Sequence, residues 1–216
     1  MNPITTIRTA LVLAGCTGLT AYAAGQKLTS SELEQGRLYL RQTRNYVIGA
    51  TQGLSEAQWN FKPAPDRWSI AEIVEHMVLT QEFFLGPVRE QLAKAPAPSA
   101  DRDYQQVDRL VVSALPDRLA TFQAPESLQP TGRWTPTAAF DRLLKNYGRL
   151  SDYLESTPDL RQHIVEAPPI KAISKGAYDS MDGYQWVLAI AAHTERHTKQ
   201  ILEVKADPHF PRPAFL

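Results

Sequence analysis

The 216-residue chain has very little cysteine and no excess of charge of either sign. Its one cysteine, Cys16, lies near the N-terminus, so the rest of the chain can form no disulfide and offers no thiol to a metal. Any metal bound there must be held by nitrogen and oxygen atoms. Lys and Arg together number 23, as do Asp and Glu, and the resulting formal net charge of zero argues against a nucleic-acid partner.

The chain also lacks internal repeats and any convincing alternation of apolar and polar residues of the kind that marks a strand. Hydrophobic residues make up 43% and charged residues 21%, which is enough apolar material for the core of one ordinary domain. Glycine is modest at 11, but proline is high at 16, and the prolines cluster between apolar segments. This distribution predicts helices separated by stiff loops.

The first 24 residues have the pattern of an export signal. Arg8 is the only charged residue in this stretch, and it is followed by an apolar run that ends in the small residues of the A-Y-A sequence at 21–23. A basic start, a short apolar run and an A-x-A end are typical of a secretory signal peptide. We therefore expect a signal peptide over residues 1–24 and an exported domain over 25–216, in the periplasm or secreted.

A lipoprotein is the alternative form of export. Leu13-Ala14-Gly15-Cys16 resembles the bacterial lipobox, and a lipid attached to Cys16 would anchor the domain to a membrane. The apolar run between Arg8 and Cys16 is short, which favours the soluble form. A membrane partner is expected only if Cys16 is lipidated.

Four long segments have apolar residues spaced three and four apart, the period of a helix with one buried face. The expected helices cover residues 30–53, 70–94, 136–157 and 183–205, with a shorter helix over 104–114. Gly86-Pro87 is expected to kink or divide the second helix. Residues 159–181 read as irregular, and a long proline-rich region joins the second helix to the third. The expected fold is therefore all-α, a four-helix bundle with a long crossover between helices two and three.

Three of the five histidines lie on faces that should point into this bundle. The inward stripe of the last helix is Trp186, Ile190, His193, His197, Ile201 and Val204. The matching stripe of the second helix is Ile73, His76, Thr80, Phe83 and Pro87. Side chains four apart on a helix have Cβ atoms about 5–6 Å apart, so His193 and His197 can bind one ion together.

Burying these three imidazoles without partners would be costly, and sharing one cation removes the cost. His76, His193 and His197 are therefore the candidate ligands of one divalent metal ion. The competing interpretation is that each is an ordinary hydrogen-bonded core residue, because a lone His-x-x-x-His pair is common on helices. His163, in a proline-rich loop, and His209, in the tail, are expected to be exposed and to play no part.

Two acidic residues lie close to the candidate ligands. Glu195 follows His193 by two positions, not by one as in the HExxH metalloprotease motif, so an ideal helix turns it away from the metal. Glu72 lies one turn before His76, where it could support that histidine by a hydrogen bond. Its spacing from Ser69 is that of a capping box, and this simpler role is favoured.

The segments PAPDRWSIAEIVEHM (residues 63–77) and AAHTERHTKQI (191–201) resemble the DinB-like superfamily, named after a DNA-damage-inducible protein. The resemblance extends over about residues 30–207. It implies a four-helix bundle with a long connection between the second and third helices, and a metal held by His76, His193 and His197. It also implies zinc, nickel or a similar divalent ion, and a homodimer. Trp68 and Ser69 carry over as a packed aromatic residue and a helix cap.

Relatives in that superfamily include bacillithiol transferases and the mycothiol-dependent maleylpyruvate isomerase. Those enzymes are cytoplasmic, so the export signal departs from the pattern and argues against thiol transfer here. Three neutral histidines leave a coordination position for water or for a small-molecule substrate, and hydrolysis or thiol addition could follow. No catalytic residue can be named from the sequence.

Other functional classes compete with an enzyme. One is a non-catalytic, metal-binding or metal-stabilised domain at the cell envelope. Another is a bundle in which the histidines no longer bind metal. DNA binding, which the superfamily name suggests, is opposed by the zero net charge and by the export signal.

Overall fold

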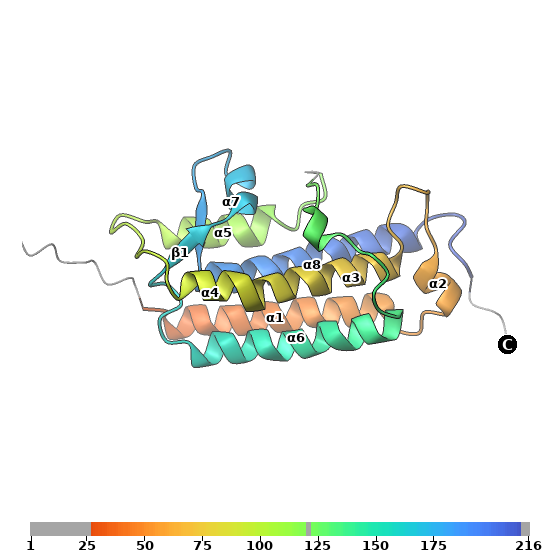
Figure 1. Cartoon of the computed structure of the whole chain (residues 1–216), viewed down its shortest axis with the longest axis horizontal. Coiled ribbons are helices and arrows are strands. Elements are labelled where there is room, and N and C mark those ends of the chain that lie inside the picture. Colours follow the sequence, from red (N-terminus) through yellow and green to blue (C-terminus); the bar gives the residue numbers. More distant parts are fainter. Residues whose placement is uncertain (1–26, 120–121, 213–216) are drawn as a thin grey trace, which may run out of the picture.

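The computed structural model describes residues 27–119 and 122–212. The expected signal peptide and Cys16 lie outside these residues. Four long helices dominate the described part, and they form the expected all-α bundle (Figure 1). They are α1 (Ser30–Thr51), α3 (Ile70–Phe83), α6 (Pro136–Ser156) and α8 (Gly183–Lys205).

Shorter elements decorate this bundle. A π-helical turn, η1 (Phe84–Val88), and α4 (Arg89–Leu92) continue α3. The remaining elements are α2 (Glu56–Asn60), α5 (Tyr104–Ala114), the 3₁₀ turn η2 (Glu126–Leu128), β1 (Ile164–Glu166), α7 (Pro168–Ile173) and β2 (Ser180–Asp182). None of the described helices has the length and apolar character needed to cross a membrane.

The long helices begin where side chains can cap them. Thr29, Ser69, Thr135 and Asp182 each accept a hydrogen bond from a backbone N–H in the first turn of the helix that follows. A helix start leaves several N–H groups without partners, and such a cap stabilises it by roughly 1 kcal/mol. Ser69 and Glu72 form the predicted capping box. These local signals explain why the sequence locates the helix starts so closely.

The order of the helices around the bundle explains the long crossover. α1 packs against α8 and α6, and α3 packs against the same two helices. Figure 1 shows α1 and α8 running in one direction and α3 and α6 in the other. Hydrogen bonds at both ends of the first pair agree, since Tyr184 Oη donates to the Glu32 carbonyl and Lys205 Nζ to the Ala50 carbonyl. Because α3 and α6 are parallel neighbours, the chain between them must travel back along the whole bundle.

The second helix differs from the stripe that the sequence predicts. Ile73 and His76 are buried, but Phe83 is 40% exposed and Pro87 is also exposed, so the outer half of the stripe is wrong. α3 has neighbours on most of its sides, so buried residues occur all around it and no single apolar stripe exists. The expected break at Gly86-Pro87 is confirmed as the π-helical turn, which accommodates a proline that has no N–H to donate.

Two short strands occur in the segment expected to be irregular. β1 and β2 pair antiparallel, with Val165 opposite Met181. Three residues per strand are too few for an alternation to be recognised in the sequence. Asp182, the last residue of β2, is also the cap of α8.

A buried ion cluster ties the bundle together at the start of α1 and α8. The guanidinium of Arg161 is fully buried and contacts the carboxylates of Glu32 at 2.7 Å, Asp108 at 2.6 Å and Asp182 at 2.9 Å. One cation thus serves three acids from α1, α5 and the cap of α8. Burial raises the pKa of Asp182 to about 6, even though Arg161 and the Gln185 backbone N–H lower it.

Candidate metal centre

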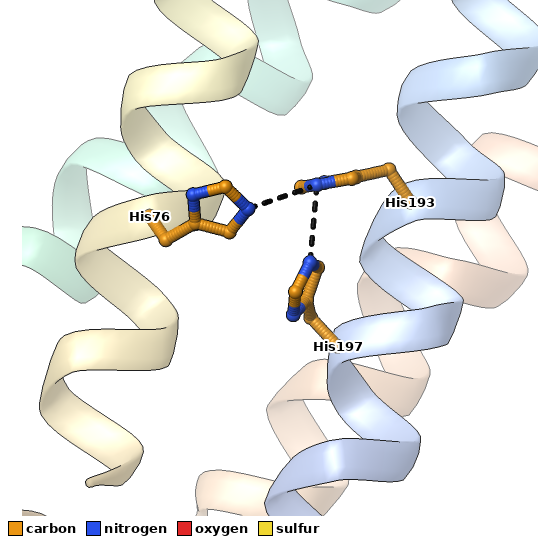
Figure 2. Close-up of side chains that lie close together, drawn as sticks. All are labelled: His76, His193 and His197. Carbon is orange, nitrogen blue, oxygen red and sulfur yellow. Dashed lines mark hydrogen bonds between the residues drawn. The ribbon is translucent and has the colours of Figure 1, made fainter. Parts of the chain in front are cut away.

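The structure brings the three candidate histidines together. His76 on α3 faces His193 and His197 on α8, and all three rings point to one place (Figure 2). The Nε2 atom of His193 lies 3.1 Å from Nε2 of His76 and 3.1 Å from Nε2 of His197. The three nitrogens lie within 4.8 Å of one another. His76 is 5% and His197 7% exposed, while His193 is partly exposed.

The opposite nitrogens of two rings are held by hydrogen bonds. Nδ1 of His76 lies 2.8 Å from the carbonyl oxygen of Leu128, and Nδ1 of His197 lies 2.8 Å from Oε1 of Gln200. Both partners are acceptors, so each Nδ1 carries the proton and donates it. The lone pairs of the two Nε2 atoms are then directed into the space between the three rings. This arrangement orients histidines in metal sites and makes them better ligands.

Hydrogen bonds alone cannot satisfy this cluster. If Nδ1 carries the proton in His76 and His197, only His193 has an Nε2–H to donate, and it can donate to one neighbour only. The Nε2 atom of the other neighbour would then lie 3.1 Å from His193 with a lone pair that no donor reaches. A cation between the three nitrogens can accept all of their lone pairs, so the donor set fits a divalent metal.

The protonation of the cluster favours metal binding as well. Burial lowers the pKa of all three imidazoles, and the neighbouring histidines lower the pKa of His193 and His197 further. The rings are therefore neutral at pH 7 and their lone pairs are available. The lowered pKa values favour metal binding because a protonated imidazolium ring has no free lone pair to give to a metal.

The ring of Trp68 packs against two of the three histidines. Its ring centroid lies 4.9 Å from that of His76 and 6.4 Å from that of His197, with the latter pair stacked. Trp68 immediately precedes Ser69, the cap of α3, so the same short segment starts the helix and covers the site. Its packing is the role that the sequence predicts, but it packs on the histidines themselves.

The acidic residues near the ligands in sequence have other partners. Glu72 accepts from the Ser69 backbone N–H at 2.7 Å and from Lys62 Nζ at 2.9 Å, which confirms the capping role. Glu195 accepts from Tyr39 Oη at 2.9 Å and pairs with Lys199 at 2.8 Å, so it faces α1 and, as expected, is turned away from the cluster.

The two remaining histidines lie away from the cluster. The side chain of His209 is 89% exposed, as predicted, and pairs with Asp207. His163 is half-buried, and its Nδ1 lies 2.7 Å from the carbonyl oxygen of Ala95, so the expectation that it is exposed is wrong. This contact joins the residue just before β1 to the segment that follows α4.

Sequence reasoning does not find the two groups that hold the histidine rings. These are Gln200 and the Leu128 carbonyl, which accept hydrogen bonds from His197 and His76. Gln200 is detectable in principle, since it lies three residues after His197 on the same helix. The Leu128 contact is 52 positions from His76 and leaves no pattern in the sequence.

Two surface cavities lie near η1 and α4. One of about 770 Å³ lies between α4 and β1, and another of about 570 Å³ lies beside η1 and His163. Neither is lined by any of the three clustered histidines. Of the three histidines, His193 is the one that is partly exposed.

Comparison with known proteins places this geometry in a family. The uncharacterized protein YuaE of Bacillus subtilis (strain 168) is 21% identical over 154 residues, which cover 71% of this chain and 87% of YuaE. The structure of YfiT from Bacillus subtilis, described as a probable metal-dependent hydrolase with an unusual four-helix bundle topology, superposes with a TM-score of 0.53. That likeness has 13% identity, covers 82% of this chain and 88% of YfiT, and concerns the fold. The DinB superfamily matches residues 39–201, a range that contains all three histidines, and the chain therefore belongs to the DinB superfamily.

Proposed function

We propose that His76, His193 and His197 bind one divalent metal ion, with zinc or nickel the expected metal, and that the centre hydrolyses a small molecule. The observation that carries the proposal is the convergence of three Nε2 atoms within 4.8 Å. Two of the rings are held by Nδ1 hydrogen bonds that direct their lone pairs to the same place. The description of YfiT as a probable metal-dependent hydrolase supports the reaction class.

The residues divide the work of such a site. The three neutral imidazoles would hold the ion and would leave room on it for water or a substrate. A bound divalent ion supplies Lewis acidity, which acidifies water and polarises carbonyl groups. Trp68 covers the rings of His76 and His197, which keeps water from that side of the ligands. The partly exposed side of His193 is the direction from which a small molecule can approach.

No side chain is assigned as general base. Glu72, Glu75 and Glu195 are each hydrogen-bonded to other partners. Thiol transfer is the other reaction that such a site can support, so metal-loaded protein should be assayed with ester and amide substrates and with thiol acceptors.

Cobalt(II) in place of the native metal tests whether the centre is open. Azide added to the cobalt protein should change the visible absorption spectrum, because an anion can enter the vacant position. Phe83→Ala is a matched control on α3, since Phe83 lies on the exposed side of that helix. A cobalt spectrum that azide leaves unchanged, at any concentration that keeps the protein folded, would contradict an open site.

The same experiment distinguishes the second candidate, a metal-stabilised domain without activity. The burial of His76 and His197, and the distance of the two cavities from the cluster, favour this alternative. It predicts four protein ligands, or a fully enclosed ion, and therefore a spectrum indifferent to azide.

Export and partners are proposed from the sequence alone. We propose that the signal peptide over 1–24 is removed and that the domain acts in the periplasm or outside the cell. Protein from cells whose N-terminus lies near residue 25 would support this, whereas protein that keeps residues 1–24 and is found in the cytoplasmic fraction would oppose it. A homodimer and the absence of nucleic acid are likewise proposals, which light scattering and a DNA-binding assay test.

A further inference from the structure

One segment of the long crossover lies across α3 beside the histidine cluster. Residues 126–133, here called the strap, begin with η2 and end just before the cap of α6. The Leu128 carbonyl oxygen in the strap accepts the Nδ1 hydrogen of His76 at 2.8 Å. The position of the strap therefore decides which nitrogen of His76 carries the proton.

Glu75 holds the other end of the strap. One carboxylate oxygen accepts from the Thr131 backbone N–H at 3.0 Å, and the other accepts from the Gly132 backbone N–H at 2.9 Å. A longer contact of 3.4 Å joins the first oxygen to the Arg133 backbone N–H. Glu75 is 3% exposed, and a carboxylate that is so buried must be hydrogen-bonded or it would destabilise the fold.

The turn of the strap is shaped for this contact. Gly132 has a φ of +71°, in the left-handed region that glycine adopts without strain. This conformation presents successive N–H groups to a single anion, as in other anion-binding turns. Since Glu75 and His76 are adjacent on α3, the carboxylate and the imidazole contact the same strap three residues apart.

Among the described residues, the hydrogen bonds between the strap and α3 are those of Glu75 and His76. The Glu75 carboxylate also lies 3.5 Å from Nε of Arg133 in the strap. His197 differs, because its Nδ1 partner Gln200 lies on the same helix three residues later. The orientation of His197 is thus fixed locally, whereas that of His76 depends on a distant segment that Glu75 anchors.

We propose that Glu75 is a positioning residue of the histidine cluster. By anchoring the strap, it keeps the Leu128 carbonyl against Nδ1 of His76, which holds the proton on Nδ1 and the lone pair on Nε2. The lone pair then points toward His193 and His197, where the proposed metal binds. The part of this inference that concerns metal affinity rests on the proposed function, but the part that concerns the His76 proton does not.

The first test uses metal-free protein labelled with ¹⁵N in histidine. Long-range ¹H–¹⁵N spectra should show His76 with its proton on Nδ1 in the wild type and in Glu72→Gln. Glu72 is a matched control, because it is a carboxylate on the same helix that contacts Ser69 and Lys62 instead of the strap. In Glu75→Gln, the proton should be shared between Nδ1 and Nε2. An unchanged Nδ1–H form in folded Glu75→Gln would overturn the proposal.

The second test measures cobalt(II) affinity by competition with a chelating dye. Groups that orient metal-binding histidines typically change affinity by about 10–100-fold when they are mutated, and we expect about tenfold weaker binding in Glu75→Gln. Glu72→Gln should bind as the wild type does. Equal affinity in Glu75→Gln, even with a lower thermal midpoint, would make Glu75 merely structural and overturn the proposal.

Two further outcomes remain decisive. If the wild type binds no cobalt, the proposed function fails, and the histidine spectra alone decide the role of Glu75. If Glu75→Gln does not fold, Gly132→Ala strains the same turn from the strap side without touching α3. It should shift the His76 proton in the same direction, and a wild-type spectrum in folded Gly132→Ala would overturn the proposal.

Discussion

Zinc added to metal-free protein should raise the midpoint of thermal unfolding, and His197→Ala should abolish the effect. His76 and His193 are 117 positions apart, so the full ligand set exists only in the folded chain. A ligand that binds only the folded state adds about 2.7 kcal/mol at a free concentration 100-fold above its dissociation constant. For a domain of this size, about 1 kcal/mol raises the midpoint by roughly 2–4 °C. The expected shift is therefore about 5–11 °C.

Differential scanning fluorimetry with and without zinc measures this shift, with a chelator to restore the metal-free midpoint. His209→Ala is the matched control, because His209 is 89% exposed and lies outside the cluster. Its zinc shift should equal that of the wild type. The reasoning is refuted if folded wild-type protein shows the same midpoint with and without zinc, or if His197→Ala keeps the full shift.

Three further predictions concern the fold that supports the site. Arg161→Met leaves the buried carboxylate of Asp182 and the partly exposed ones of Glu32 and Asp108 without their cation. The unfolding free energy in urea should therefore fall by about 3–5 kcal/mol, and a loss below about 1 kcal/mol would contradict this. The pKa of Asp182 is raised by burial from 3.8 to about 6, so the folded state holds this proton more tightly and stability falls as pH rises through that window. Asp182→Asn should remove that part of the slope in urea unfolding series, and an unchanged slope would oppose the pKa shift. A Cβ at Gly183 would lie 2.9 Å from Tyr153 Oη and 3.0 Å from the Leu160 carbonyl oxygen. Gly183→Ala should therefore lower the free energy of unfolding by about 1–3 kcal/mol, and an unchanged free energy would contradict this steric argument.

The features that the sequence predicts well depend on residues close together in the chain. The caps at Ser69 and Asp182 act within three residues, and the His193–His197 pair lies on one turn of one helix. Their chemistry is therefore visible in the local pattern. His76 joins them because helix periodicity places it on the inward side of a second helix, and the structure confirms that the three rings meet.

The features that it misses depend on contacts between distant segments. Phe83 and Pro87 fit an apolar stripe in the sequence, but α3 is buried on most sides and its exposed side is set by the neighbouring helices. The partner of His76 is a backbone carbonyl, which any residue at position 128 would supply. Glu75 reads as an ordinary surface acid until the strap is placed above it.

The unusual helix order gives these distant contacts their importance. Since α3 and α6 are parallel, the crossover must return along the bundle, and its last part passes the histidine cluster. The crossover therefore does more than connect two helices, because it supplies the Leu128 carbonyl that contacts Nδ1 of His76.

Metal content tests the central claim most directly. Protein spanning residues 25–216, prepared without a histidine tag, should be analysed by mass spectrometry beside His193→Ala and His197→Ala. Because the three histidines form a site for one ion, we predict about one equivalent of a divalent metal in the wild type and its loss in both variants. Wild-type protein that is folded, metal-free, and takes up no zinc, nickel or manganese on titration would contradict the account.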